Sequence, residues 1–137
     1  METTALEKAR AYFERDRYAA MSGFVIESVD GDAATVTCEI RDCHLNAADT
    51  VMGGVLFALA DYTFAVGCNA AWLRGTGART VAADCHIQFL KAARGGRLTA
   101  RAVPLQNGRK LGFYRVEVTD ENGQLIAVMQ CAGCRTE

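Results

Sequence analysis

The sequence predicts an α+β fold in which one curved antiparallel sheet of about six strands wraps around a single long buried helix. The chain has 137 residues, half of them apolar, which suits a single domain over residues 1–137 with one core. Residues 54–73 are apolar on almost every face, and a helix of that kind must be covered by other elements. Apolar and polar residues alternate with a period of two on both sides of this segment, as in half-buried strands. We therefore expect the strands to cover the helix.

The N-terminal part predicts a short helix followed by a β-hairpin. Thr4 and Glu7 have the spacing of a capping box. Apolar residues then recur at helical spacing through about Tyr18, at Leu6, Ala9 and Phe13. Beyond residue 23 the period changes to two, and residues 30–32 have the Asp-Gly-Asp composition of a turn between two strands.

Four further strands are expected after the long helix, over residues 79–90, 96–105, 111–120 and 124–134. Alternation between Tyr114 and Val118 predicts an antiparallel sheet with one face in solvent. Pro104 favours an edge strand or a bulge, because proline cannot donate a ladder hydrogen bond.

Composition argues against several classes of protein. Fifteen Lys and Arg against sixteen Asp and Glu give a formal net charge of −1, which supplies no net field to attract nucleic acid or anionic lipid. A membrane span over residues 54–73 is disfavoured by Asp61, since an Asp at a helix centre costs about 2.5–3.5 kcal/mol to insert. The first ten residues lack the basic and apolar regions of an export signal, which favours a cytoplasmic protein.

The cysteines and histidines restrict the chemistry further. Six cysteines are expected to stay reduced in the cytoplasm. Cys131 and Cys134 have metal-like spacing, but residues three apart in a strand point to opposite faces, so we interpret them as unrelated structural thiols and expect no metal. Any imidazole chemistry must use His44 or His86. His86 falls on the polar face of its strand, whereas His44 lies in a loop that could contact a substrate.

Asp61 is the costliest residue of the long helix to accommodate. An ionised carboxylate among apolar side chains must be paired, hydrogen-bonded, raised in pKa or brought to an interface. One interpretation is a structural Asp that bonds a backbone loop. The other begins with Gly53 and Gly54 at the helix start, which leave backbone amides open to an approaching oxygen. If two helices pair antiparallel in a dimer, the acid of one chain could act on a carbonyl polarised by the amides of the other.

The segment from His44 to Asp61 resembles the hotdog-fold acyl-CoA thioesterases of the phenylacetate-pathway (PaaI-type) family, which carry the pattern N-x-x-G-x-x-H-G-G-x-x-x-x-L-x-D. Residues 87–91 and 95–100 resemble that family's third and fourth strands. The resemblance implies hydrolysis of an acyl-CoA thioester, with coenzyme A as part of the substrate and no separate cofactor. It also implies homodimers that pair through a continuous sheet, and commonly a dimer of dimers.

The resemblance implies roles for individual residues as well. Asp61 is expected to be nucleophile or general base, the Gly53 amide to polarise the thioester carbonyl, and Asn46 to position the substrate or the catalytic loop. Further substrate contacts are expected at Gly54, Met52, Tyr62, Ala83, Lys91 and Arg94. Among these, Tyr62 is expected at the dimer seam, and some of the cations, with Arg109 and Lys110, near the CoA phosphates.

Two residues depart from the family pattern. Met52 stands where the family has His, and it cannot donate a hydrogen bond or carry a proton. Ala83 stands where members often carry a Ser or Thr that holds the hydrolytic water. We therefore keep a second hypothesis, a non-catalytic or weakly active acyl-CoA-binding protein of the same fold. A hotdog dehydratase is a poorer third, because that chemistry needs a catalytic His and neither His is at the helix start.

Overall fold

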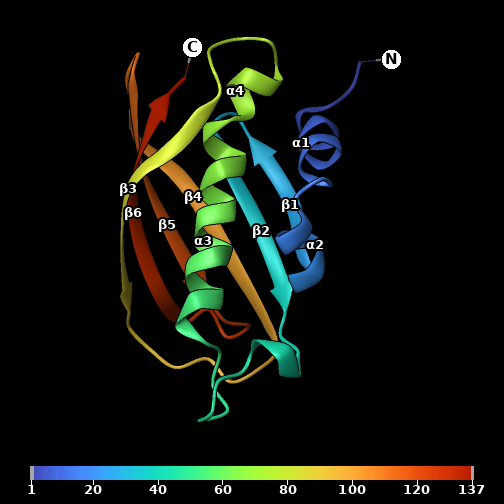
Figure 1. Ribbon diagram of the computed structural model, residues 1–137, viewed down its shortest axis with the longest axis vertical. Coiled ribbons are helices and arrows are strands. Elements are labelled where there is room, and N and C mark those ends of the chain that lie inside the picture. The colour runs from blue at the N-terminus through green and yellow to red at the C-terminus, as the bar shows by residue number, and fades with distance from the viewer. Residues whose placement is uncertain (1, 137) are drawn as a thin grey trace.

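Six antiparallel strands form one sheet in the order β1-β2-β4-β5-β6-β3, and the sheet curves around the long helix α3 (Figure 1). The computed structural model describes residues 2–136. The elements are α1 (Ala5–Phe13), α2 (Arg17–Ser22), β1 (Phe24–Asp30), β2 (Ala33–Glu39), a short 3-10 helix (Asp42–His44), α3 (Gly53–Cys68), α4 (Ala70–Leu73), β3 (Thr80–Phe89), β4 (Arg97–Asn107), β5 (Leu111–Thr119) and β6 (Leu125–Arg135).

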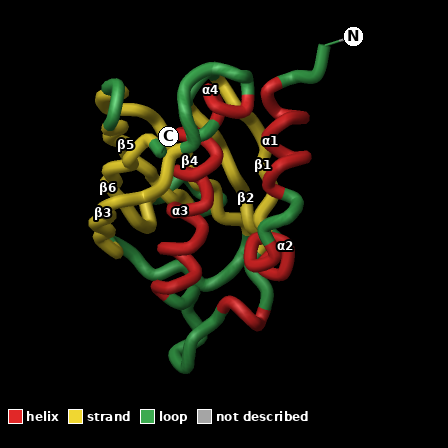
Figure 2. The backbone as a smooth tube through the Cα atoms, turned by 45° about the horizontal axis from the view of Figure 1, so that its top comes forward, coloured by secondary structure: helices red, strands yellow, loops and turns green. Residues whose placement is uncertain are grey.

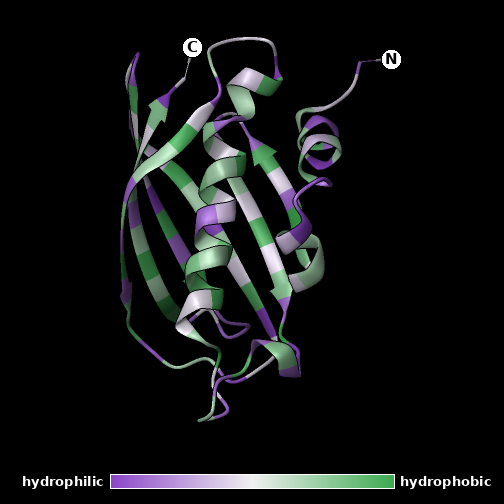
Figure 3. Cartoon of the chain, in the orientation of Figure 1, coloured by the Kyte–Doolittle hydropathy of each residue, from purple (hydrophilic) through white to green (hydrophobic). Residues whose placement is uncertain are grey.

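The core lies between α3 and the inner face of the sheet. Figure 2, turned from the first view, shows the strands curling around the helix, and Figure 3 shows α3 hydrophobic over most of its length. Leu59, Phe64 and Val66 on the helix are at most 1% exposed, as are Val116 and Ile126 on the sheet. Burial of such side chains stabilises the fold by about 1.5–3 kcal/mol each. The predicted fold, a curved sheet around a buried helix, is confirmed.

The N-terminal segment forms two helices where one was expected through Tyr18. The capping box at Thr4 is present, but α1 ends at Phe13. Asp16 then starts α2, because its side chain accepts a hydrogen bond from the Ala19 amide at 3.0 Å. An Asp in that position satisfies one of the amides left unpaired at a helix start. The prediction missed this second start signal.

The long helix is also shorter than expected, ending at Cys68 rather than Leu73. Asn69 follows it with φ −101° and ψ 1°, outside the helical region. Its side-chain amide donates to the Thr80 carbonyl at 3.1 Å and accepts from the Thr80 amide at 2.7 Å. This pair of bonds ties the end of α3 to the start of β3, and four residues of α4 complete the connection.

The hairpin β1–β2 and all four later strands are confirmed, with irregularities in β4 and β3. Pro104 lies in β4, which is a central strand, and the predicted bulge occurs beside it, between Pro104 and Gln106. A second bulge leaves Ala83 of β3 without a partner on β6. Cys131 is buried and Cys134 exposed, as expected for opposite faces. None of the helices between residues 2 and 136 has the length and hydropathy of a transmembrane segment.

Candidate active site

The loop before α3 is anchored from inside by His44. The ring is 2% exposed, its Nδ1 accepts the Arg41 amide at 2.8 Å, and its Nε2 lies 2.9 Å from the Ser22 carbonyl. Because a carbonyl oxygen can only accept, Nε2 carries the proton. Both ring nitrogens are occupied within the chain. His44 therefore holds the loop in place and has no ring nitrogen left for the substrate contact that its loop position left open.

Asn46 organises the outer part of the same loop. Its side-chain oxygen accepts the amides of Ala48 at 2.9 Å and Thr50 at 3.2 Å, and its side-chain nitrogen donates to the Thr50 hydroxyl at 3.0 Å. The loop takes a left-handed residue at Asp49, with φ 59°. These bonds fix the approach of the chain to Met52 and the first turn of α3.

The first two amides of α3 are free. Met52 precedes the helix, its side chain makes no capping bond, and its carbonyl accepts the amides of Val55 and Leu56. Gly53 and Gly54 come before those two donors, so within residues 2–136 their N–H groups have no partner in the helix. A helix start of this kind favours an oxygen with negative charge.

Phe89 and Met52 flank this glycine pair. A Cβ built on Gly53 would lie 3.3 Å from the Phe89 ring, and one on Gly54 would lie 2.7 Å from the Met52 methyl group. Both flanking side chains are about half exposed, at 53% and 47%. A cavity of about 290 Å³ adjoins Gly53 and is also lined by Leu56, Phe89 and Lys91. The free amides therefore lie at an apolar mouth with one cation close by.

Asp61 lies on the outward stripe of α3, whose other partly exposed members are Gly54, Phe57, Ala58 and Ala65. Burial raises the pKa of its carboxyl group, and the negative charge of Asp16 raises it further. No hydrogen bond within the described chain stabilises the carboxylate. The two effects act in the same direction, so Asp61 is more basic than an ordinary Asp. A second cavity of about 250 Å³ is lined by both Asp61 and Asp16.

Within one chain, Asp61 and the free amides are too far apart to act on the same atom. Asp61 is eight residues beyond Gly53, which corresponds to about 12 Å along the axis at 1.5 Å per residue. Hydrogen bonding and attack on a carbonyl each require approach to roughly 3 Å. A site that uses both groups must take them from two chains.

The remaining predicted site residues are dispersed. Tyr62 is 8% exposed and packs against Phe13 and Phe24, so it lies inside the chain rather than at its surface. Burial raises the pKa of its hydroxyl to about 12. Ala83 is exposed on β3, and Arg94 is exposed beyond that strand without lining the Gly53 cavity. Arg109 lines a different cavity, with Arg135 near the end of α3.

Sequence reasoning missed two residues near the site. Phe89 carries only the signal of an aromatic residue at the end of a strand, which does not reveal that it covers Gly53. Asp16 could have been found as a helix start signal, since it precedes a run of helix-forming residues. Its place beside Asp61 comes from tertiary packing, which brings both residues to one cavity.

β3 presents a free edge. It pairs with β6 on one side and has no neighbour on the other in the described sheet. Val81, Phe89 and Leu90 on or just after this strand are 41–53% exposed. An edge with unpaired backbone groups and exposed apolar side chains is suited to pairing with another strand.

Comparison with known proteins places the chain in a family. Residues 48–127 match the family described as the thioesterase superfamily. The acyl-coenzyme A thioesterase PaaI of Escherichia coli strain K12 is 34% identical over 131 residues, which are 95% of this chain and 90% of that protein. The solved structure of E. coli PaaI, from the phenylacetic acid degradation operon, has a TM-score of 0.88 at 32% identity and covers 98% of this chain and 97% of that one.

A second solved structure agrees. The TT0310 protein of Thermus thermophilus has a TM-score of 0.80 at 35% identity, and the match covers 89% of this chain and 99% of that one. The region that matches the family, residues 48–127, contains the end of the loop, the glycine pair, α3, β3, β4, β5 and the start of β6. The chain therefore belongs to the thioesterase superfamily, as a PaaI-like member with the hotdog fold.

Proposed function

We propose that the protein hydrolyses acyl-CoA thioesters, with Asp61 of one chain and the Gly53 amide of a partner chain acting on the same carbonyl. The observation that carries the proposal is a half-buried carboxylate with no hydrogen bond on a helix that begins with free amides. Its relative in E. coli, named an acyl-coenzyme A thioesterase, is similar over 95% of this chain.

The proposed reaction uses the carboxylate, the amide and water, without a bound cofactor. The free N–H of Gly53 stabilises the negative oxygen that forms as the carbonyl is attacked. Asp61 either attacks the carbonyl, forming an anhydride that water then hydrolyses, or removes a proton from the attacking water. In both routes the C–S bond breaks, CoA leaves as the thiolate, and the acyl group leaves as a carboxylic acid. Raised basicity of Asp61 favours either role.

We propose a homodimer formed through the free edge of β3, with two dimers pairing into a tetramer. Pairing there would extend the sheet and cover Val81 and Phe89. It would also allow the outward stripe of α3, with Asp61 at its middle, to approach the partner's helix. The axial separation of about 12 Å between Gly53 and Asp61 supports this assembly, because two antiparallel helices offset along their axes can bring unlike ends together.

The substrate's CoA portion is proposed to lie along the mouth beside Gly53. Lys91 lines that cavity and can pair with a CoA phosphate, and the exposed Arg94 follows three residues later. The half-exposed Phe89 and Met52 offer apolar contacts to the pantetheine arm or the acyl group. Ala83, small and exposed on β3, leaves room for the acyl group.

The amide's role can be tested with a matched pair of variants, Gly53→Pro and Gly53→Ala. Both place a Cβ against Phe89, but only proline removes the N–H. Proline is tolerated at the first helical position, and Met52, at φ −61° and ψ 139°, has the conformation that precedes proline. We expect Gly53→Pro to lower kcat by about 10²–10³-fold relative to Gly53→Ala. Equal rates for the two folded variants would exclude the amide.

The shared site can be tested by mixing two inactive chains. A heterodimer of Gly53→Pro with Asp61→Asn has one site with an intact amide and an intact carboxylate. Random pairing after co-refolding gives half heterodimers, so about a quarter of wild-type activity should return. A site contained within one chain predicts no recovery, and so does a monomer. Light scattering on the same samples reports whether dimers or tetramers are present.

The second candidate, acyl-CoA binding with little turnover, is favoured by one observation. Met52 occupies the position at which another side chain could donate a second hydrogen bond to the oxygen bound by the free amides. The Met52 side chain cannot donate one, and it makes no capping bond. A panel of aliphatic and aromatic acyl-CoA substrates separates the two functions. Turnover that Asp61→Asn abolishes supports hydrolysis, whereas calorimetric binding of acyl-CoA with no turnover on any substrate supports a binding protein.

A further inference from the structure

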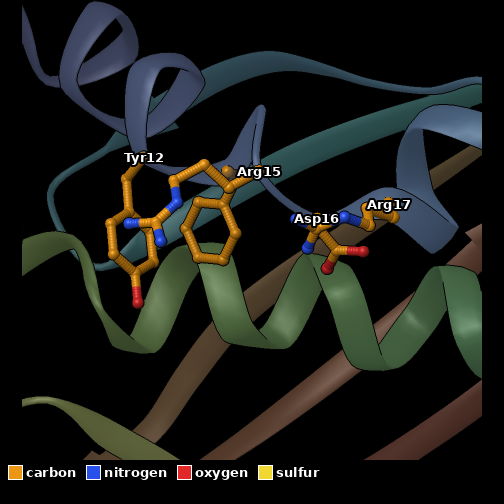
Figure 4. Close-up of a pocket in the computed structure, with 5 residues that line it drawn as sticks. Tyr12, Arg15, Asp16 and Arg17 are labelled. Atoms are coloured by element: carbon orange, nitrogen blue, oxygen red, sulfur yellow. The ribbon is translucent and has the colours of Figure 1, made fainter.

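A second carboxylate, Asp16, lies beside Asp61 at the connection between α1 and α2. Both line one cavity of about 250 Å³, together with Tyr18, Ala58 and Tyr62. Figure 4 shows the side chain of Asp16 directed toward α3 from this connection. The Ala19 amide donates to Asp16 at 3.0 Å, and α1 is held on the sheet by Arg10, which donates to the Ile26 carbonyl at 2.7 and 3.0 Å. The carboxylate is therefore fixed in place by two anchored helices.

We infer that Asp16 is a positioning residue for thioester hydrolysis, whose negative charge makes Asp61 a stronger base or nucleophile. The inference rests on the proposed function, since it assigns a purpose to the basicity of Asp61. Two carboxylates that share a cavity disfavour each other's ionisation. After burial, the charge of Asp16 is the other cause that raises the pKa of Asp61.

The other titratable groups near Asp61 add no charge that would oppose or reproduce the effect of Asp16 on the pKa of Asp61. They are Tyr18 from α2, Tyr62 and Cys68 from α3, Cys85 from β3 and Cys131 from β6. Burial raises the pKa of Tyr62 and of Cys68 to about 12 and raises those of the Cys85 and Cys131 thiols as well. The three thiols and Tyr62 are thus neutral near pH 7.

Asp16 forms no ion pair in the described chain. Arg15 and Arg17 flank it and line a neighbouring cavity with it (Figure 4). The four ion pairs found between residues 2 and 136 all involve other side chains. The negative charge of Asp16 is therefore free to act on the cavity that it shares with Asp61.

A purely structural role for Asp16, as the cap of α2, is the alternative to be separated. Asn caps a helix about as well as Asp but carries no charge. Asp16→Asn therefore keeps the cap and removes the field. Asp120→Asn is the matched control. The Asp120 side chain likewise accepts backbone amides, those of Asn122 and Gln124 at 2.9 Å, and its charge is not among the causes that shift the pKa of Asp61.

The first measurement is the carboxyl titration of Asp61, followed by carbon NMR in the three proteins. We expect the pKa of Asp61 to fall in Asp16→Asn and to stay unchanged in Asp120→Asn. High salt should lower it in wild type and in the control but have little effect in Asp16→Asn, because salt screens the removed interaction. An unchanged Asp61 midpoint in folded Asp16→Asn would overturn the inference.

The second measurement is the pH dependence of kcat/KM on the best acyl-CoA. In Asp16→Asn the acidic limb should move to lower pH. At the pH of half-maximal wild-type activity, its rate relative to its own plateau should therefore rise, by at most about two-fold. Loss of activity at all pH values with an unmoved limb is the outcome of a structural role and overturns the inference. If wild type hydrolyses no thioester, the proposed function fails, while the NMR titration still decides whether Asp16 acts on Asp61.

Discussion

Asp61 in the middle of α3 and Asn69 just after its end are both polar residues among apolar ones, but their surroundings differ. Asn69 is 6% exposed, and its amide group bonds to the carbonyls of Ala65 and Thr80 and to the Thr80 amide. Asp61 is partly exposed, opens onto a cavity and has no hydrogen bond within the described chain. A buried polar side chain whose donor and acceptor groups both have hydrogen-bond partners is typical of a residue that stabilises the fold. An unsatisfied charge that the fold tolerates marks a candidate for chemistry.

Asp61→Asn gives the largest expected effect and tests the functional role proposed for Asp61. Asn has the same shape but is a much weaker base and nucleophile, so kcat should fall by about 10³-fold or more. The variant should remain folded, because no hydrogen bond is lost. Steady-state rates and circular dichroism check both statements. Activity retained in a folded variant would make Asp61 a structural residue after all.

Asn69→Ala tests the structural role of Asn69 at the end of α3. It removes the two bonds to Thr80 and leaves a buried amide and a buried carbonyl of that residue unpaired, so the free energy of unfolding should fall by about 2–4 kcal/mol. Urea denaturation measures this loss. Activity per folded molecule should change much less than in Asp61→Asn. A variant as stable as wild type would show that the helix end does not depend on this contact.

Met52→His tests how the residue before the free amides of α3 affects turnover. A histidine could donate one hydrogen bond at the mouth of the site, and a neutral bond contributes about 0.5–1.5 kcal/mol. We expect kcat on the best thioester to rise by up to about ten-fold with a smaller change in KM. A lower kcat, or no turnover with any acyl-CoA, would indicate a site rebuilt around Met52 and favour the binding protein.

The smallest expected effect is on the pH dependence of the free energy of unfolding. Because the folded-state pKa of Asp61 lies above its unfolded value, ionisation costs more in the folded chain. This cost is absent below the unfolded pKa, about 4. It grows as the pH rises from the unfolded pKa to the folded pKa, and it stays constant above the folded pKa. Asp61→Asn should thus be slightly more stable than wild type at pH 7 but not below pH 4. A variant that gained stability only at acid pH would contradict the assigned direction.

Periodicity was enough to predict the buried helix, the wrapping sheet and each strand, because a two-residue period and an all-round apolar segment are local properties. Asp61 and Gly53 could be proposed as site residues for a similar reason, since the sequence pattern that contains them is continuous. Asp16 and Phe89 were missed because their contacts with these residues arise only after α1, α2 and β3 pack around α3. The dual role of Asn69 was missed as well, since ending a helix by bonding a distant strand leaves no local signal.

The bulge at Ala83 has a consequence for how related chains can differ in length. Thr80 and Ala82 lie on the helix side of β3, yet so do Cys85 and Ile87, because the unpaired residue changes the alternation from even to odd positions. A chain that lacked this residue would alternate regularly, with Ala82 and Cys85 still on the helix side and Asp84 and His86 still on the other face. The loss of one residue at the bulge is therefore compatible with the fold, whereas a strand of unchanged length without the bulge would turn Asp84 and His86 toward the apolar helix.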